Sequence, residues 1–220
     1  MLPKIAIFVS GRGSNLQALI RHAKKCNQLD SIGVIISNRS DAPALAYSKQ
    51  QGLKTAFIDQ KKLNRAFFES KISKQLMING CNWIFMAGFM VILSPSFIIK
   101  WPNIINIHPS LLPLYKGLNT HQRVIEAKDD KHGCTVHLVN QKLDDGPILA
   151  QASMPVKAYH RLDCDRLARD VLSLEHQLYP MVFDWVISQK LTIQKGKAYH
   201  QDYQLPVLWS EVRSSDLFKP

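Results

Sequence analysis

Residues 4–16 read KIAIFVSGRGSNL, and this stretch decides the fold class. Residues 4–9 are mostly apolar and predict a short buried strand, while the apolar positions within residues 14–25 recur at the spacing of one helix face. A turn with two glycines separates them. The stretch therefore predicts a strand, a glycine turn and a helix, in that order.

The same alternation continues through the first half of the chain. Further strands are predicted at 31–37, 55–58, 82–86 and 104–107, and helices at 41–51 and 67–77. Strands that are apolar on both faces and alternate with helices indicate an α/β fold, in which a mostly parallel twisted sheet has helices on both faces. In such sheets ligands bind outside the carboxyl ends of the strands.

The pattern changes after the proline-rich residues 109–113. A helix at 120–127 and strands at 135–139 and 148–156 indicate a hairpin or a mixed sheet in the C-terminal part. Residues 162–187 form a long helical pattern that we expect to break or bend near Pro180, and the polar tail from Lys195 is expected to be irregular. We expect one domain at 1–190, with halves at about 1–100 and 101–190, and an appendage at 191–220.

Composition narrows the class of protein. The 220 residues are 46% hydrophobic and 20% charged, which is typical of a folded globular protein. The longest apolar run, 83–93, is too short to cross a bilayer, and the N-terminus has no secretory pattern, so we expect a cytoplasmic protein without a membrane partner. The four cysteines and eight histidines show no metal-ligand spacing, so no metal is expected.

The net charge of +11 would attract a polyanion. The basic residues are dispersed, however, and no arginine-rich or aromatic-basic motif accompanies them. We therefore expect a solvated basic surface or small anionic substrates, and no nucleic acid partner.

The loop at residues 10–15 (SGRGSN) carries the first functional motif. It lies between a predicted strand and a helix, where backbone N–H groups and the helix dipole favour a phosphate. Gly11 and Gly13 permit a tight turn, and Ser14 and Asn15 offer hydrogen bonds. A structural turn with a capping serine is the alternative. A dinucleotide is disfavoured because residues 34–37 read VIIS where a ribose-binding acid would fall.

Asn106 and His108 carry the second motif, at the end of a predicted strand. Residues two apart on a strand face the same way, so both side chains face one site. Asn106 would donate a hydrogen bond to a developing oxyanion, and His108 would hold or deliver a proton. Asp144, in the turn LDDGP at 143–147, carries a carboxylate that would orient the histidine. A buried structural histidine and a plain turn are the alternatives.

Five motifs together resemble the folate-dependent glycinamide ribonucleotide transformylases over nearly the whole chain: SGRGSN at 10–15, GFM at 88–90, ILSP at 92–95, NIHPSLLP at 106–113 and LDDGP at 143–147. The resemblance implies a Rossmann-like N-terminal half and a possible homodimer. It also implies 10-formyltetrahydrofolate as formyl donor and glycinamide ribonucleotide as acceptor, in purine biosynthesis.

The same resemblance implies roles for individual residues. The catalytic group would be Asn106, His108 and Asp144. Substrate would be bound by Gly13, Ser14, Asn15, Leu172, Ser173, Leu174 and Glu175. The folate site would be lined by Arg65, Met90, Val91, Ile92, Leu93, Asn106, Asn140, Gln141, Lys142, Leu143 and Asp144.

Three positions depart from the family pattern. Val91 stands where members often have an arginine suited to a folate carboxylate, so another cation such as Lys100 would supply that contact. Asp145 stands where a small residue is common, and Asn119 replaces a frequent histidine.

Two rival functions remain open from the sequence. A methionyl-tRNA formyltransferase shares the NIHPSLLP stretch, but it has an extra C-terminal tRNA-binding domain, for which the tail after Ile187 is too short, and lacks the phosphate loop. A non-catalytic nucleotide-binding module would use residues 11–15 alone and keep His108 for structure.

Overall fold

The computed structural model describes residues 3–209, which fall in two compact units, Met1–Asn106 and Ile107–Pro220. In the first unit five strands pair in parallel in the order β5-β4-β1-β2-β3. They are β1 (Ile5–Val9), β2 (Ile32–Ser37), β3 (Thr55–Phe57), β4 (Trp83–Met86) and β5 (Ile104–His108). β1, β2 and β4 are buried along their whole length, as strands covered on both faces must be.

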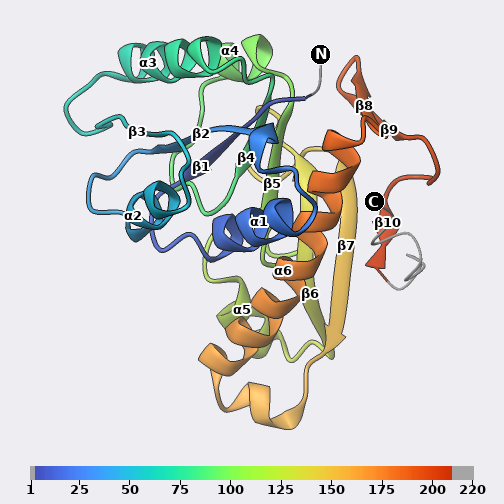
Figure 1. The fold of residues 1–220 in the computed structure, drawn as a ribbon. Helices are drawn as coiled ribbons and strands as arrows, with labels where there is room; N and C mark the ends of the chain where they lie inside the picture. Colours follow the sequence, from blue (N-terminus) through green and yellow to red (C-terminus); the bar gives the residue numbers. More distant parts are fainter. Residues whose placement is uncertain (1–2, 210–220) are drawn as a thin grey trace. The chain divides into compact units, whose positions relative to one another are not determined.

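Helices cover both faces of this parallel sheet (Figure 1). α1 (Ser14–Lys25) and α2 (Pro43–Gln50) lie on one face, and α3 (Arg65–Ile78) and α4 (Pro95–Lys100) lie on the other. The apolar side chains of α1 that the sequence spacing singles out are all fully buried: Leu16, Leu19, Ile20 and Ala23. The predicted α/β class and parallel sheet are therefore confirmed.

The buried carboxylate of Glu69 joins α3 to α4. Its Oε1 accepts from the backbone N–H of Ser94 at 2.7 Å, and its Oε2 accepts from the Ser94 hydroxyl. The Ser94 Oγ in turn accepts from the N–H of Phe97 and caps α4, with Pro95 in the first turn. This short helix was not among the predicted elements.

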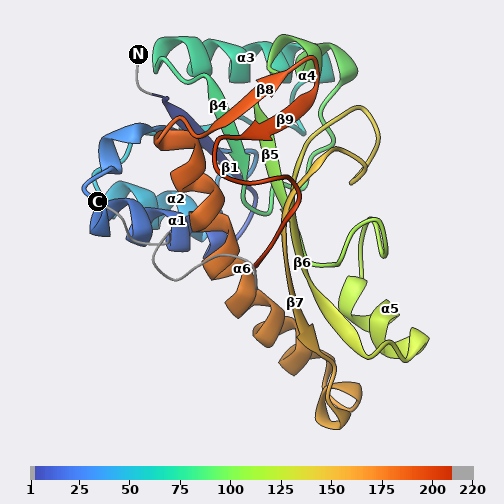
Figure 2. The same cartoon turned by 90° about the vertical axis from the view of Figure 1, so that its right-hand side faces the viewer.

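The second unit contains the mixed part of the fold. β6 (Lys131–Leu138) and β7 (Ile148–Pro155) pair antiparallel, and the short β10 (Val207–Leu208) pairs parallel with β7. α5 (Thr120–Ala127) precedes β6, and α6 (Cys164–Ile187) lies along β6 and β7 (Figure 2). The predicted hairpin or mixed sheet of the C-terminal part is thus confirmed.

Two expectations about the C-terminal part need correction. α6 is continuous through Pro180, so a break there is wrong: Pro180 is itself buried, and fully buried Leu178, Tyr179, Val182 and Phe183 flank it. Their burial offsets the roughly 3 kcal/mol that an interior proline costs a helix. The tail from Lys195 is not irregular throughout, because β8 (Leu191–Gln194) and β9 (Lys197–His200) form an antiparallel hairpin.

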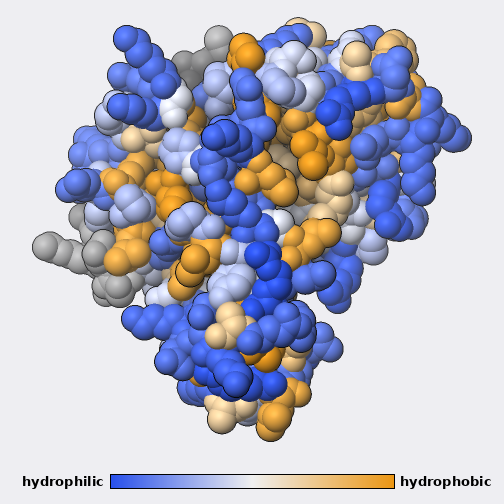
Figure 3. All heavy atoms as spheres, turned by 180° about the vertical axis from the view of Figure 1, so that it is seen from behind, coloured by the Kyte–Doolittle hydropathy of each residue, from blue (hydrophilic) through white to orange (hydrophobic). Residues whose placement is uncertain are grey.

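Hydrophilic side chains predominate on the face drawn in Figure 3, with apolar side chains in groups between them. Within residues 3–209, no helix combines the length and apolar character that a membrane span requires.

Candidate functional site

The loop at residues 10–15 joins β1 to α1, as predicted. Gly13 is the residue before α1 and has a left-handed backbone with φ of 70°. A Cβ added there would lie 2.8 Å from the Cβ of Ala44, a distance that side chains cannot accept. Gly13 is therefore required twice, by its backbone conformation and by the close approach of α2. The first turn of α1 holds no acidic residue, so its N–H groups keep their attraction for an anion.

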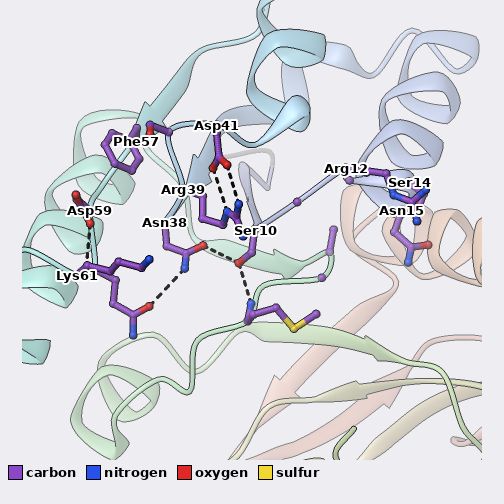
Figure 4. A pocket seen from close by; sticks show the side chains of 17 residues that line it. Ser10, Arg12, Ser14, Asn15, Asn38, Arg39, Asp41, Phe57, Asp59 and Lys61 are labelled. Carbon is purple, nitrogen blue, oxygen red and sulfur yellow. Dashed lines mark hydrogen bonds and ion pairs between the residues drawn. The ribbon is translucent and has the colours of Figure 1, made fainter. Parts of the chain in front are cut away.

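This loop forms one wall of a cavity of about 780 Å³ in the first unit (Figure 4). The cavity lies outside the carboxyl ends of β1, β2, β3 and β4, where the fold class places ligands. Its lining residues are Ser10, Gly11, Arg12, Gly13, Ser14, Asn15, Asn38, Arg39, Ser40, Asp41, Phe57, Asp59, Gln60, Lys61, Ala87, Gly88 and Met90.

A hydrogen-bonded chain crosses the floor of the cavity (Figure 4). The buried Ser10 hydroxyl donates to Asn38 Oδ1 at 2.6 Å and accepts from the backbone N–H of Met90 at 2.8 Å. Asn38 Nδ2 donates onward to Gln60 Oε1 at 3.4 Å. Ser10 thus ties the loop at residues 10–15 to the segments that follow β2 and β4.

Positive charge exceeds negative charge on the cavity wall. The lining residues include three cations, Arg12, Arg39 and Lys61, and two carboxylates, Asp41 and Asp59. Arg39 binds Asp41 through two hydrogen bonds, and this pairing lowers the pKa of the Asp41 carboxyl and raises that of Arg39. An anionic ligand would therefore meet a net positive wall.

In the second unit, His108 and Asp144 come together as the sequence predicts. The distance from His108 Nδ1 to Asp144 Oδ2 is 3.5 Å, and both side chains are over 90% buried. The same Asp144 oxygen accepts from the backbone N–H of Gly117 at 2.9 Å. Asp144 has φ of 48°, a conformation that aspartate and asparagine adopt more readily than most residues. Asn106 lies two residues before His108 on β5, so the two side chains share one face of that strand.

The other ring nitrogen of His108 is also occupied. Its Nε2 lies 2.9 Å from the backbone oxygen of Tyr115, so an Nε2–H would donate to that carbonyl. When the ring is protonated, both N–H groups have acceptors: the Tyr115 carbonyl on one side and the Asp144 carboxylate on the other. This arrangement holds the ring in a fixed orientation.

The structure adds a histidine that sequence reasoning missed. His137 on β6 places Nε2 3.8 Å from Asp144 Oδ1, while its Nδ1 lies 2.8 Å from the Leu138 carbonyl. Burial lowers the pKa of His137, so this ring is neutral at neutral pH. The only sequence signal was its position in a predicted strand that runs toward the LDDGP turn.

A half-buried histidine, His121, and a fully buried one, His132, lie nearby in the sequence. His121 Nδ1 and His132 Nε2 are 2.9 Å apart. Burial lowers both pKa values, that of His132 to about 4. They form a neutral pair at neutral pH.

The remaining predicted residues are spread over several elements. Gly13, Ser14, Asn15 and Met90 line the cavity together, whereas Leu172, Ser173, Leu174 and the buried Glu175 lie on α6. Arg65 begins α3, Val91 and Leu93 are buried, and Met90 and Ile92 are exposed. Asn140, Gln141, Lys142 and Leu143 lie in the loop before Asp144, where Asn140 Nδ2 donates to the Asp145 carbonyl at 3.0 Å.

The structure places two of the departing positions, Asp145 and Asn119, and the substitute cation Lys100 in different local settings. Asp145 pairs with Lys116, which lowers the pKa of its carboxyl. Asn119 precedes α5 with φ of 57°. Lys100 ends α4 and is exposed.

Comparisons with known proteins agree with this geometry. A family model described as "Formyl transferase" matches residues 3–183. A phosphoribosylglycinamide formyltransferase of Haemophilus influenzae is 37% identical over 207 residues, covering 93% of this chain and 97% of that protein. The Escherichia coli enzyme of the same name is 36% identical, with coverage of 92% and 95%.

A solved structure extends the likeness to three dimensions. The phosphoribosylglycinamide formyltransferase of Coxiella burnetii superimposes with a TM-score of 0.85 at 35% identity, covering 91% of this chain and 94% of that one. Sequence, fold and family model agree over most of both chains, and the chain therefore belongs to the formyl transferase family.

Proposed function

We propose that this protein transfers a formyl group from 10-formyltetrahydrofolate to the amine of glycinamide ribonucleotide, in purine biosynthesis. The observation that carries the proposal is the 3.5 Å approach of His108 Nδ1 to Asp144 Oδ2, with Asn106 on the same face of β5 as His108. Relatives that match nearly the full chain are named for this activity. A cytoplasmic location fits such a role and belongs to the same proposal.

The substrate phosphate would bind at the loop of residues 10–15. Gly13 brings the backbone close to the ligand, and Ser14 and Asn15 offer side-chain hydrogen bonds at the start of α1. The net positive wall of the cavity supports the binding of a dianionic sugar phosphate.

The reaction needs no covalent enzyme intermediate. The substrate amine attacks the formyl carbon, a C–N bond forms, and the carbonyl electron pair moves onto oxygen. The resulting tetrahedral intermediate loses the amine proton. Its bond to the folate nitrogen then breaks, and that nitrogen takes up a proton. Holding the two reactants in the attacking geometry supplies much of the rate gain.

Asn106 and His108 would stabilise the oxyanion. Asn106 donates a hydrogen bond through its amide, while the protonated His108 contributes positive charge that Asp144 maintains. In this conformation the Nε2–H of His108 donates to the Tyr115 carbonyl. The ring would therefore stabilise the oxyanion through its charge and not through a direct hydrogen bond.

The other residues would hold the two substrates. Leu172, Ser173, Leu174 and Glu175 on α6 would contact the acceptor, with the buried Glu175 carboxylate near its amine. The donor would contact Arg65, Met90, Val91, Ile92 and Leu93, and the loop residues Asn140, Gln141, Lys142 and Leu143. The exposed apolar side chains of Met90 and Ile92 suit a flat aromatic donor.

The test measures formyl transfer to glycinamide ribonucleotide from the folate donor, with initiator tRNA as a competing acceptor. The proposal expects activity with the ribonucleotide alone. It further expects that His108→Ala lowers kcat by about a hundredfold or more, as loss of a group that stabilises an oxyanion does. Normal kcat in the folded variant would remove His108 from the mechanism, and formylation of tRNA instead would replace the acceptor.

A further inference from the structure

The cavity in the first unit has two ends, and the proposed function uses only one of them. Figure 4 shows Arg12, Ser14 and Asn15 at one end and Phe57, Asp59 and Lys61 at the other, with Ser10 and Asn38 between. We name the second end, formed by Asn38, Phe57, Asp59, Gln60 and Lys61, the distal lobe. It lies outside the carboxyl ends of β2 and β3.

Phe57 makes the distal lobe unlike a plain phosphate site. It is the last residue of β3, it lines the cavity, and 45% of it is exposed. An exposed aromatic ring on the wall of the cavity offers a stacking surface for a flat heteroaromatic group.

Polar groups beside the ring match the edges of such a group. Asn38 Oδ1 accepts a hydrogen bond from Ser10, and one N–H of Asn38 Nδ2 donates to Gln60. These two bonds fix the orientation of the amide, and its second N–H can donate to a ligand. The Gln60 amide and the Lys61 ammonium add further donors. The Asp59 carboxylate uses Oδ1 for the N–H of Lys61 and offers its other oxygen as an acceptor.

The spacing of the strands connects the lobe with the phosphate loop. β1 pairs with β2, and β2 pairs with β3, so two strand spacings of about 4.8 Å separate the two ends. In open α/β sheets a nucleotide lies in this way, with phosphate at the first loop and ribose beside the end of the second strand.

We propose that the cavity also binds a nucleoside monophosphate, whose phosphate takes the loop at residues 10–15 and whose base stacks on Phe57. The proposal rests on the proposed function in one respect, because both ligands share that phosphate site. A bound nucleotide therefore excludes glycinamide ribonucleotide and acts as a competitive inhibitor.

The experiment compares AMP with ribose 5-phosphate, which has the same phosphate and sugar without a base. Calorimetry on the full chain is expected to show AMP binding on the order of tenfold more tightly, since stacking on one aromatic ring contributes about that much. Phe57→Ala should remove the difference and leave ribose 5-phosphate binding unchanged. Phe67→Ala, an exposed phenylalanine on α3 outside the cavity, is the matched control and should keep the difference.

Steady-state kinetics provide the second readout. AMP should raise the apparent KM for glycinamide ribonucleotide and leave kcat unchanged. Equal binding of AMP and ribose 5-phosphate, or an AMP preference that survives Phe57→Ala, would refute base binding in the distal lobe. Phosphate binding at residues 10–15 would not be affected by either result. Failure of both ligands to bind overturns the phosphate site as well, and non-competitive inhibition overturns the shared site.

Discussion

Replacing Asp144 by asparagine isolates the contribution of one negative charge. Asparagine tolerates the left-handed backbone at this position, with φ of 48°, and its amide oxygen still accepts from the N–H of Gly117. The fold is therefore expected to persist. What disappears is the attraction between the carboxylate and the protonated His108.

The size of the effect follows from the geometry. At the 3.5 Å separation, two unit charges attract by about 5 kcal/mol at an effective dielectric constant of about 20, and the over 90% burial of both groups limits screening by water. Each 1.4 kcal/mol, approximately, is a factor of ten in rate. The asparagine dipole retains part of the attraction, so we expect kcat to fall by about 10²-fold to 10³-fold.

The assay follows the release of the folate product at saturating concentrations of both substrates. The matched control is Asp145→Asn, which removes the neighbouring charge from an exposed pair with Lys116 and should change kcat by less than about threefold. A folded Asp144→Asn variant with the wild-type kcat would refute electrostatic support of His108. Equal losses in both variants would show that the loop, and not the charge, is responsible.

Three further predictions concern the fold around the two sites. Gly13→Ala should raise KM for glycinamide ribonucleotide by at least about tenfold, because a left-handed alanine costs about 1–2 kcal/mol and its Cβ meets Ala44 at 2.8 Å; steady-state kinetics with an unaltered KM would contradict this. Ser10→Ala should lower the free energy of unfolding by about 1–3 kcal/mol in urea titrations, since the N–H of Met90 and the Asn38 oxygen lose their partner, whereas Ser10→Thr should retain most of it. Stability should decline as pH falls from about 6.5 to about 4, because His132 is protonated in the unfolded chain before the folded one. Urea midpoints measured across this range check the decline, which should be smaller in His132→Gln, and a flat profile in the wild type would contradict it.

Most of the first unit could be predicted from the sequence because β1, β2 and β4 are buried along their whole length. β1 is a continuous run of five fully buried apolar residues, whereas the apolar residues of the amphipathic helix α1 recur every three or four positions. The two patterns can therefore be told apart in the sequence. α4 was not predicted, because its six residues are too few to show a helical repeat of apolar positions. Its capping residue, Ser94, was not recognised as the start of a helix.

The C-terminal corrections have a different physical cause. β9 is polar and half exposed, so its pairing with β8 leaves no periodic apolar signal. A proline inside α6 removes one backbone hydrogen bond of the helix, so the sequence predicts a break. The helix continues because Pro180 and its neighbours are buried in tertiary contacts, which the local sequence does not show.

For the candidate site, the sequence predicted that His108 and Asp144 meet, and the 3.5 Å distance confirms it. It could not predict His137 or the Tyr115 carbonyl as neighbours of this pair. The first contact depends on where the turn that carries Asp144 lies beside β6, and the second depends on the path of the loop after β5. The roles of these residues in turnover stay predictions.

The Glu69–Ser94 contact has a consequence for protein engineering. Residues 90–93 run between two fixed points: the N–H of Met90 is held by the Ser10 hydroxyl, and the N–H of Ser94 is held by the Glu69 carboxylate. Insertions or deletions within these four positions would displace the N–H of Met90 from the Ser10 hydroxyl or the N–H of Ser94 from the Glu69 carboxylate. Variants that alter this segment should therefore exchange side chains at constant length, beginning with the exposed Met90 and Ile92.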